Sequence, residues 1–392
     1  MSGIANSTTF TEKAISDLRT WVEIDLSAVQ HNIGTLRKKA GPGRLVMACV
    51  KSNAYGHGLV EVARAAEAAG VDRLAVAQVD EGLVLRQAGL AVPIQVLMEP
   101  SAQAVEEMRR HRLIASLSTP EVVHRMATGY YGPLTVHIEV DTGMGRVPLQ
   151  ADRAEDFLAL LKRERGFNIE GIFSHFACAG KPGNPFCDTF TYHQLNTFTG
   201  LCDRLAEKGF RIRLKHIAGS DAVAFYPRSY LDMIRPGAWV YGYKSQSIGL
   251  DLKPVLSWKT KIFRITAAPA GRPVGYEMAF RPSQDTRIAH LPVGYGDGYP
   301  RALSNCSEVL IKGQRAPVVG LIGMESMIVD VGHIPGDLEG QEAVLIGCQG
   351  AEKITAAGLA KRIDLFAAMI TCGIKESVPR IYKPAMEMRW NT

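Results

Sequence analysis

Five residues that could carry chemistry lie at or just after the ends of short apolar runs. They are a lysine, two arginines, a histidine and a serine, namely Lys51, Arg146, His175, Ser220 and Arg235. If the runs are parallel strands of one barrel, their carboxyl ends meet at a single mouth. A lysine at such a mouth loses its charge readily, as Schiff-base chemistry requires. Together these residues favour a cofactor that carries a phosphate group.

Each of these residues also has a structural explanation when it is considered alone. A lysine after a strand, such as Lys51, is usually a solvated surface residue. His175 could be a hydrogen-bonded histidine of the core, and Arg146 could cap a helix or form an ion pair. The functional interpretation therefore depends on the whole set rather than on any single member.

Small residues at the expected mouth add to the case for a ligand. Gly56 and Gly58 follow the lysine closely, and glycine lets the backbone approach a ligand. Ser220 follows the seventh apolar run, and Gly237 and Ala238 lie within the eighth. Barrels commonly bind phosphate after these two strands.

Eight apolar runs between about Val22 and Tyr243 alternate with amphipathic, helix-like segments. The runs occupy 45–50, 73–79, 93–98, 114–118, 134–140, 169–176, 213–219 and 233–242. Buried parallel strands are continuous apolar runs that need a helix between them. The pattern predicts an α/β fold, and a count of eight favours a (β/α)8 TIM barrel. A doubly wound open sheet would alternate in the same way.

After about Pro254 the pattern changes to short strand-like runs broken by Gly, Pro and Asp. Only the segment ITAAGLAKRIDLFAAMI looks helical. We therefore predict three regions: an N-terminal extension at 1–20, the barrel at 21–254, and a mostly β C-terminal domain at 255–392.

The composition of the 392-residue chain excludes several classes of protein. The net charge is only +6, and Lys and Arg are scattered, so a nucleic-acid partner is not expected. Seven dispersed cysteines without a C-x-x-C pair indicate reduced thiols. No secretory signal is visible, and no apolar stretch approaches the ~20 residues that span a bilayer. We expect a cytoplasmic protein without a membrane partner.

Two other kinds of cofactor motif are incomplete or absent. The segment GYGDGYP at 294–300 resembles a glycine-rich phosphate loop, but it lacks the G-x-G-x-x-G spacing and a following helix. H-E-x-x-H and cysteine-rich metal patterns do not occur, so we expect no metal. Scattered His and Asp residues could still meet in three dimensions.

The motifs of the chain, taken in order, resemble those of the alanine racemase family. The resemblance runs from about Trp21 to about Met386. Its motifs are VEIDLSAVQHNI, VMACVKSNAYGHG, DTGMGR, IRPGAWVYG, VGYGDGYPR, EGQEAVLIG and SVPR. It implies a pyridoxal-phosphate-binding barrel, a C-terminal β domain and a head-to-tail homodimer. In that dimer, the β domain of one subunit completes the site of the other.

The resemblance implies two catalytic bases, because inverting a carbon centre needs a proton donor on one face and an acceptor on the other. Lys51 matches the lysine that binds the cofactor and serves one face. Tyr276, in PVGYEM, matches the second base, contributed by the partner subunit. Without the family match, Tyr276 would be interpreted as a structural strand tyrosine.

The remaining site residues are also implied by resemblance. The contacts to the cofactor phosphate match Tyr55, Ser220, Gly237 and Ala238. The arginine that faces the pyridine nitrogen matches Arg235, and its support matches His175. The residues near the substrate match Arg146, Tyr295 and Met324.

The chain departs from the family pattern mainly around the entrance and the outer part of the site. The departures are Glu139, Gly180, Gly219, Leu321, Glu325 and Ala368. Glu139 stands where many relatives carry a carbamylated lysine that orients the arginine matching Arg146. A glutamate also supplies a carboxylate there, with a shorter reach. Leu321 and Ala368 replace an arginine and a tyrosine, so a different or larger amino acid could enter.

Three alternatives to an alanine racemase stay open at this point. Within the enzyme class, the substrate could be serine or another amino acid. A fold-type-III decarboxylase has a similar length and layout, but the lysine motif and the order of the later motifs disfavour it. A non-catalytic pyridoxal-phosphate-binding barrel would lack the region 255–392, including Tyr276.

Overall fold

The computed structural model describes residues 17–127, 132–164, 166–243 and 249–384. These residues form two compact units. Within them, the barrel unit comprises 29–54 and 59–253, and the β unit comprises 17–28, 55–58 and 254–384. The predicted boundaries at 20/21 and 254/255 stay a prediction.

The barrel unit is built on eight parallel strands in the order β8-β7-β6-β5-β4-β3-β2-β9. They are β2 (Leu45–Cys49), β3 (Arg73–Val76), β4 (Ile94–Val96), β5 (Leu113–Leu117), β6 (Leu134–Glu139), β7 (Phe167–Phe173), β8 (Leu214–His216) and β9 (Met233–Ile234). The backbone N–H of Asp232 donates to Lys215 O (3.2 Å), and that of Arg235 donates to Ala218 O (2.8 Å). These bonds connect the two end strands, which confirms the predicted barrel over the open sheet.

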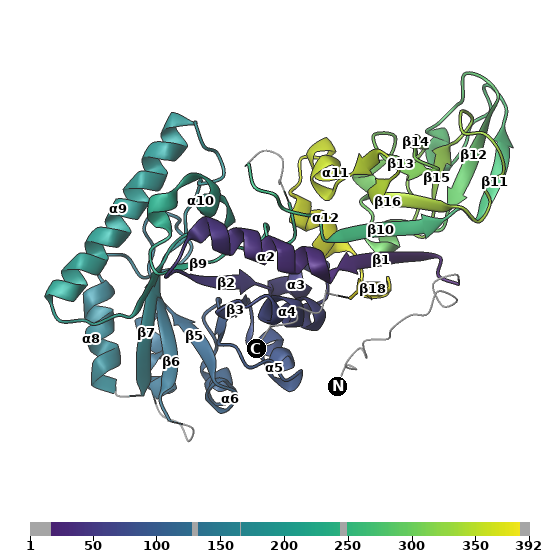
Figure 1. Cartoon of the computed structure of the whole chain (residues 1–392). Helices are drawn as coiled ribbons and strands as arrows, with labels where there is room; N and C mark the ends of the chain where they lie inside the picture. The colour runs from purple at the N-terminus through teal and green to yellow at the C-terminus, as the bar shows by residue number, and fades with distance from the viewer. Residues whose placement is uncertain (1–16, 128–131, 165, 244–248, 385–392) are drawn as a thin grey trace. The chain divides into compact units, whose positions relative to one another are not determined.

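Helices connect consecutive strands of the barrel and lie outside the ring, as α8 and α9 do beside β7 (Figure 1). They are α3 (Lys51–Gly56), α4 (Leu59–Ala68), α5 (Val79–Gln87), α6 (Val105–Arg110), α7 (Val123–Ala127), α8 (Ala154–Glu164), α9 (Pro185–Glu207) and α10 (Ser220–Phe225). A further helix, α2 (Leu26–Ala40), precedes the first barrel strand, β2. Local signals explain where α9 begins. Pro185 occupies its first turn, and the side chain of Asn184 accepts a hydrogen bond from Cys187 N (3.1 Å).

The β unit is a ten-stranded sheet with two short helices. Its strands are β1 (Thr20–Asp25), β10 (Leu256–Lys261), β11 (Arg264–Ala268), β12 (Thr286–Leu291), β13 (Glu308–Ile311), β14 (Gln314–Val319), β15 (Met327–Asp330), β16 (Glu342–Gln349), β17 (Glu352–Ile354) and β18 (Arg380–Lys383). The predicted helical segment forms α11 (Ala356–Arg362) and α12 (Ala367–Gly373). Trp258 packs edge-on against Tyr299 in the core, with ring centroids 5.7 Å apart. The mostly β character predicted for this region is confirmed.

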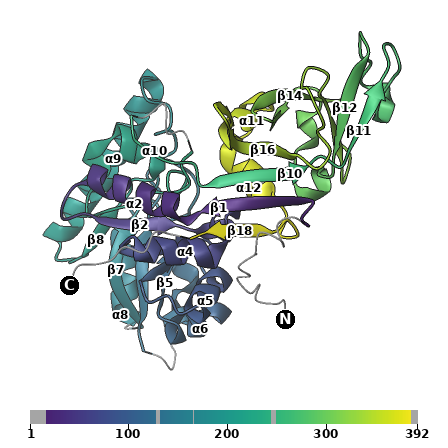
Figure 2. The same ribbon diagram turned by 45° about the vertical axis from the view of Figure 1, so that its right-hand side comes forward.

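The first strand of the described residues, β1, hydrogen-bonds within the β unit. Strand β1 pairs antiparallel with β10 and parallel with β18, and it lies between them in both views (Figures 1 and 2). Its alternate residues Val22 and Ile24 are wholly buried. A strand from the N-terminal part of the chain is therefore an inner strand of the sheet that the C-terminal part builds.

The described residues contain no disulfide bond. No helix among the described residues has both the length and the apolar character needed to cross a membrane. All seven cysteines are free thiols. Each unit is stabilised internally by a packed apolar core and by backbone hydrogen bonds between its strands.

A glycine in β7 makes room for a polar side chain inside the barrel. His137, on β6, is fully buried and lies opposite Gly171 in the register of the two strands. A Cβ atom on residue 171 would stand only 2.6 Å from Cε1 and Nδ1 of the His137 ring. The ring is itself hydrogen-bonded to His216 and Glu170, so it is not free to move away.

We predict that Gly171→Ala lowers the free energy of unfolding by about 1–3 kcal/mol, because an added methyl group overpacks a filled interior. Urea unfolding followed by circular dichroism measures the change. Gly34→Ala, in α2, is the matched control, because no neighbouring side chain or other segment lies within 4 Å of the added Cβ. Alanine favours a helix over glycine by about 1 kcal/mol, so this variant should be as stable as the parent or more so. Equal urea midpoints for Gly171→Ala and the parent protein would contradict the prediction.

Candidate active site

Lys51 begins an unusual left-handed turn directly after β2. The four residues that follow it in α3 have φ angles between +51° and +56°. A left-handed turn costs an L-residue roughly 1–2 kcal/mol, so it persists only where its surroundings impose it. Such strain concentrates at functional sites.

Hydrogen bonds from neighbouring segments hold this turn. Glu81, in the first turn of α5, accepts the backbone N–H of Ser52 at 2.5 Å through Oε1. Its other oxygen accepts the N–H of Ala77 at 2.8 Å. The side chain of Asn53 accepts the N–H of Leu59 at 2.8 Å. The backbone at Lys51 is thus anchored to the start of α5 and to the start of α4.

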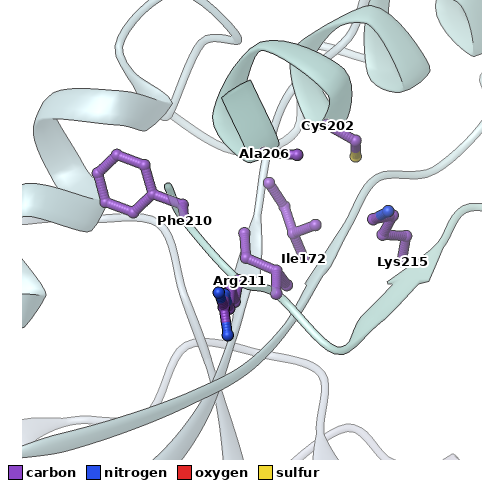
Figure 3. Close-up of a pocket in the computed structure, with 7 residues that line it drawn as sticks. Ile172, Cys202, Ala206, Phe210, Arg211 and Lys215 are labelled. Atoms are coloured by element: carbon purple, nitrogen blue, oxygen red, sulfur yellow. The ribbon is translucent and has the colours of Figure 1, made fainter. Parts of the chain in front are cut away.

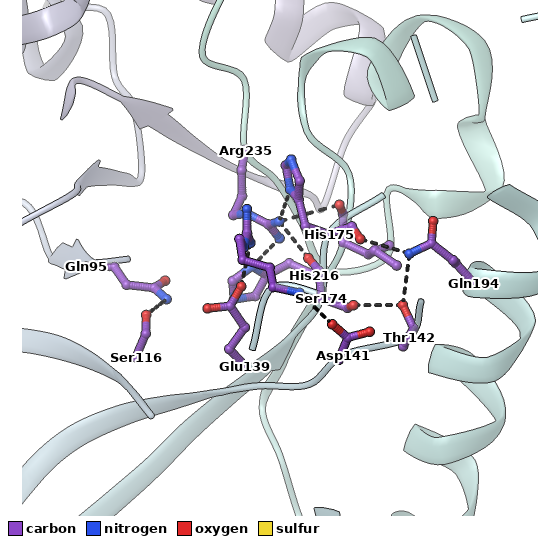
Figure 4. A network of polar contacts seen from close by, with 12 residues as sticks. Gln95, Ser116, Glu139, Asp141, Thr142, Ser174, His175, Gln194, His216 and Arg235 are labelled. Carbon is purple, nitrogen blue, oxygen red and sulfur yellow. Dashed lines mark hydrogen bonds and ion pairs between the residues drawn. The ribbon is translucent and has the colours of Figure 1, made fainter. Parts of the chain in front are cut away.

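Arg235, just after β9, is a buried cation that donates to four acceptors, on Ser174, His175, His216 and Ile217 (Figure 4). Its Nη1 donates to Nδ1 of His216 at 2.7 Å. Its Nη2 donates to Ser174 O at 2.7 Å and to Nδ1 of His175 at 3.2 Å. The guanidinium also lies 5.2 Å from the centre of the Phe173 ring. Both terminal nitrogens of the arginine are therefore bound to protein.

The loop after β6 places Arg146 against a carboxylate. Glu139 ends β6, and its Oε1 contacts Nη2 of Arg146 at 2.5 Å. Asp141 shapes the loop by accepting the N–H groups of Gly143 (2.6 Å) and Arg146 (2.9 Å). The shorter reach of glutamate, which left its geometry open from the sequence, does not prevent direct contact with the arginine.

The loops after β6 and β7 are joined to α9 by hydroxyl and amide groups (Figure 4). Thr142 and Ser174 share a hydrogen bond of 2.8 Å between their hydroxyls. Gln194, buried in α9, donates to His175 O at 3.0 Å and accepts from Ala177 N at 2.9 Å. These contacts fix the loop that carries His175.

Ser220 and Gly237 meet across β8 and β9. The hydroxyl of Ser220 accepts the backbone N–H of Gly237 at 2.8 Å. Gly237 and Ala238 begin the turn after β9, in which Val240 N donates to Gly237 O at 2.9 Å. A Cβ atom at Gly219 would stand 3.0 Å from Cε1 of His175, so the glycine in this family position makes room for the imidazole.

The charges of the barrel mouth are predominantly positive. Burial lowers the pKa of His175 to about 3, and the charges of Arg235, Arg146 and Lys51 add to the effect. Burial lowers the pKa of Arg235 to about 10, which leaves it charged at neutral pH. Three cations thus surround one neutral imidazole. This donor set fits a ligand with a phosphate or carboxylate group.

The other predicted site residues gather on one surface of the β unit. The backbone N–H of Tyr295 donates to Gly323 O (3.0 Å), and that of Gly296 donates to Met324 O (2.7 Å). Cε2 of Tyr276 lies 3.6 Å from the point that a Cβ at Gly323 would occupy. The three side chains are exposed: 70% for Tyr276, 41% for Tyr295 and 58% for Met324.

The sequence-predicted residues therefore form two groups, one in each unit. The barrel group contains Lys51, Arg146, His175, Ser220, Arg235, Gly237 and Ala238. The β-unit group contains Tyr55, Tyr276, Tyr295 and Met324. Tyr55 is partly exposed and belongs to the short segment 55–58 of that unit. The roles of all these residues stay predictions.

Several residues of the mouth were missed by the sequence reasoning. They are Asp141, Thr142, Ser174, Gln194 and His216. One signal was available for His216: it is a polar residue inside the apolar run 213–219 that was assigned to a buried strand. Gln194 carried no such signal, because its helix pattern resembles that of any amphipathic helix.

A separate cavity of about 130 Å³ lies beneath α9 on the outer side of β7 and β8 (Figure 3). It is lined by Ile172, Cys202, Ala206, Phe210, Arg211, Ile212 and Lys215. None of these residues belongs to the barrel mouth. In the described part of the chain, no three His, Cys, Asp or Glu side chains gather as metal ligands would.

Fold and site together define a (β/α)8-barrel protein with a C-terminal β domain and a mouth suited to an anionic group. Models of the alanine racemase N-terminal and C-terminal domains match residues 24–245 and 255–382. The alanine racemase of Halothermothrix orenii is 40% identical over 370 residues, which is 93% of this chain and 97% of that protein. That of Symbiobacterium thermophilum is 40% identical over 372 residues, with the same coverage.

Solved structures give the same relationship. The alanine racemase of Streptomyces coelicolor A3(2) matches with a TM-score of 0.87 at 33% identity, covering 94% of this chain and 99% of that one. The alanine racemase of Bacillus anthracis with bound L-Ala-P matches at 0.86 and 30% identity, covering 93% and 95%. The chain belongs to the alanine racemase family.

The buried histidines predict how stability depends on pH. Burial lowers the pKa of His137, His175 and His216 in the folded protein. The unfolded chain, with a histidine pKa near 6.5, binds more protons as the pH falls below that value. We expect the free energy of unfolding to fall between pH 6.5 and 5, by up to ~1.4 kcal/mol per pH unit for each histidine.

Urea unfolding at pH 7.5, 6.5 and 5.5 measures this slope. His175→Asn should reduce it, since one of the three groups is removed. Gly34→Ala, which removes no titratable group, is the control that should leave the slope unchanged. An unfolding free energy that is constant from pH 7.5 to 5.5 would rule out three neutral buried imidazoles.

Proposed function

We propose that this protein is a pyridoxal-phosphate-dependent racemase that interconverts L- and D-alanine. The observation that carries the proposal is the barrel mouth, where Lys51 lies in the same cationic cluster as the buried Arg235. A lysine amine, a fixed guanidinium and a phosphate-compatible donor set are what that cofactor needs from a protein. Family membership supports the same assignment.

Each part of the cofactor has a candidate partner in this chain. Lys51 would hold it covalently through its amine. The hydroxyl of Ser220 and the backbone of Gly237 and Ala238 would contact its phosphate, with Tyr55 as a further contact by resemblance. Nε of Arg235 has no recorded acceptor among the described residues, so its N–H is available to the ring nitrogen.

The proton transfers are assigned to two side chains. When bound, pyridoxal phosphate withdraws electrons from the α-carbon of an attached amino acid and makes the α-proton removable. Nζ of Lys51 takes or gives a proton on one face of that carbon. Oη of Tyr276, from the partner subunit, does so on the opposite face. The two groups exchange roles when the direction of reaction changes.

The substrate carboxylate is assigned to Arg146. Glu139 holds this arginine in place through their 2.5 Å ion pair, without a modified lysine. Leu321 and Ala368 stand where relatives carry larger polar residues, and both lie in the β unit. They favour a second candidate, a racemase for serine or another amino acid, which the substrate panel below separates from alanine.

A homodimer with shared sites is part of the proposal. Tyr276, Tyr295 and Met324 form an exposed surface on the β unit that is more apolar than solvent contact favours. Contact with the barrel mouth of a second copy would cover these side chains. It would also bring Tyr276 to the face of the substrate opposite the partner's Lys51.

The first test is α-deuterium exchange and enantiomer ratio over a panel of L-amino acids in D2O, using protein with its cofactor absorption band. We expect alanine to racemise fastest. Fastest racemisation of serine or another amino acid would support the same mechanism with that amino acid as the substrate. Bound cofactor with no exchange on any amino acid would sink the racemase proposal and favour a decarboxylase or a non-catalytic binding protein.

The second test uses two inactive variants, Lys51→Ala and Tyr276→Phe. Removing either base should lower turnover by on the order of 10²–10⁴-fold. If sites are shared in a dimer, co-expressing the variants as differently tagged chains restores one intact site in each mixed dimer. Half of the dimers are mixed at random pairing, so total activity should recover to about one quarter of the parent value. No recovery from purified mixed dimers would refute the shared site.

A further inference from the structure

A line of hydrogen bonds runs through the barrel interior from Arg235 to Glu170. Nη1 of Arg235 lies 2.7 Å from Nδ1 of His216. Nε2 of His216 lies 2.7 Å from Nδ1 of His137, and Nε2 of His137 lies 3.1 Å from Oε2 of Glu170. Both imidazoles are fully buried. This interior line joins the mouth to a carboxylate in the middle of β7.

The chemistry of the groups fixes the direction of every bond in the line. A guanidinium has donors only, so Nδ1 of His216 must be an acceptor without hydrogen. Burial keeps both imidazoles neutral by lowering their pKa, so each carries a single N–H. That hydrogen is on Nε2 of His216 and is donated to His137. His137 in turn carries its hydrogen on Nε2 and donates it to Glu170.

Glu170 ends the line because it can only accept. Arg73 donates to both of its oxygens, at 2.7 and 2.9 Å, and Arg213 donates at 2.7 Å. Burial acts to raise the pKa of Glu170, but the hydrogen bonds from His137 and Arg73 outweigh it and lower the pKa to about 2. The carboxylate is therefore ionised throughout the neutral range.

We propose that Glu170 is a positioning residue that sets the tautomers of His137 and His216 and thereby keeps Arg235 oriented for the cofactor. The proposal rests on the proposed function, since that function gives Arg235 its task. A donor in place of the carboxylate would reverse both imidazoles. His216 would then direct an N–H toward the guanidinium, which has only donors, so this hydrogen bond would be lost.

Both imidazole rings are closely packed by their neighbours. The His216 ring stacks on Phe173, with centroids 5.0 Å apart and an angle of 3° between the planes. The His137 ring fills the space left by Gly171. A change from acceptor to donor at residue 170 would therefore alter the hydrogen bonding of Arg235. The guanidinium would have to move away from its acceptors at Ser174 and His175.

Glutamine at residue 170 is the sharpest substitution, because it keeps the size and replaces one acceptor oxygen by a donor. The test uses the full chain with its cofactor and 15N-labelled histidine, and reads the tautomers from two-bond 1H–15N correlations at pH 6–8. The parent protein should show Nδ1 without hydrogen and Nε2–H at both His137 and His216. Glu170→Gln should give the reversed or an exchanging form, and kcat/KM for alanine should fall about tenfold, as is typical for groups that orient a ligand contact.

Two variants serve as controls. Glu170→Asp keeps the charge and should keep the parent tautomers. The side chain of Arg213, which also donates to Glu170, is 68% exposed. Arg213→Gln removes this partner and should also keep the parent tautomers. If Glu170→Gln does not fold, the parent spectrum still decides: a hydrogen on Nδ1 of His216 would overturn the proposal.

The remaining outcomes separate this inference from the proposed function. Unchanged tautomers in a folded Glu170→Gln protein would overturn the role of Glu170. Reversed tautomers with an unaltered kcat/KM would also overturn it, because the line would then have no effect on the site. Reversed tautomers in a protein that racemises no amino acid would refute the proposed function alone.

Discussion

The burial of one positive charge, on Arg235, is the constraint on which the rest of the barrel depends. A guanidinium removed from water needs acceptors for its donors, and an unpaired one would cost several kcal/mol. The acceptors come from Ser174, His175 and His216, on β8 and at the end of β7. These contacts require one particular register between β8 and β9. The backbone of Arg235 also pairs with the segment that follows β8.

Around this cation the mouth is organised by neutral imidazoles and by few carboxylates. Glu139 is committed to Arg146, and Asp141 to the backbone of its own loop. The mouth therefore presents positive charge, hydroxyl and amide groups. Such a balance favours an anionic ligand and places the amine of Lys51 near the positive charges of Arg146 and Arg235. The strained turn after β2 fixes where that amine begins.

The structure explains two of the departures from the family pattern, Glu139 and Gly219. Glu139 contacts Arg146 directly, so an encoded carboxylate occupies the position at which the resemblance implies a carbamylated lysine. Gly219 leaves room for His175. Leu321 and Ala368, by contrast, lie in the β unit, and nothing in the structure explains why they differ.

The sequence alone determined the eight strands, most of the helices, the β character of the C-terminal part and the family, because burial periodicity and ordered motifs are local properties. It also placed reactive residues at the strand ends. Tertiary structure decided what local patterns do not encode: that the sheet closes, that β1 pairs with β10 and β18, and that His216 and Glu170 join the site. These depend on contacts between distant residues, such as Arg73 and Glu170, which lie 97 positions apart. Strand register alone brings such residues together.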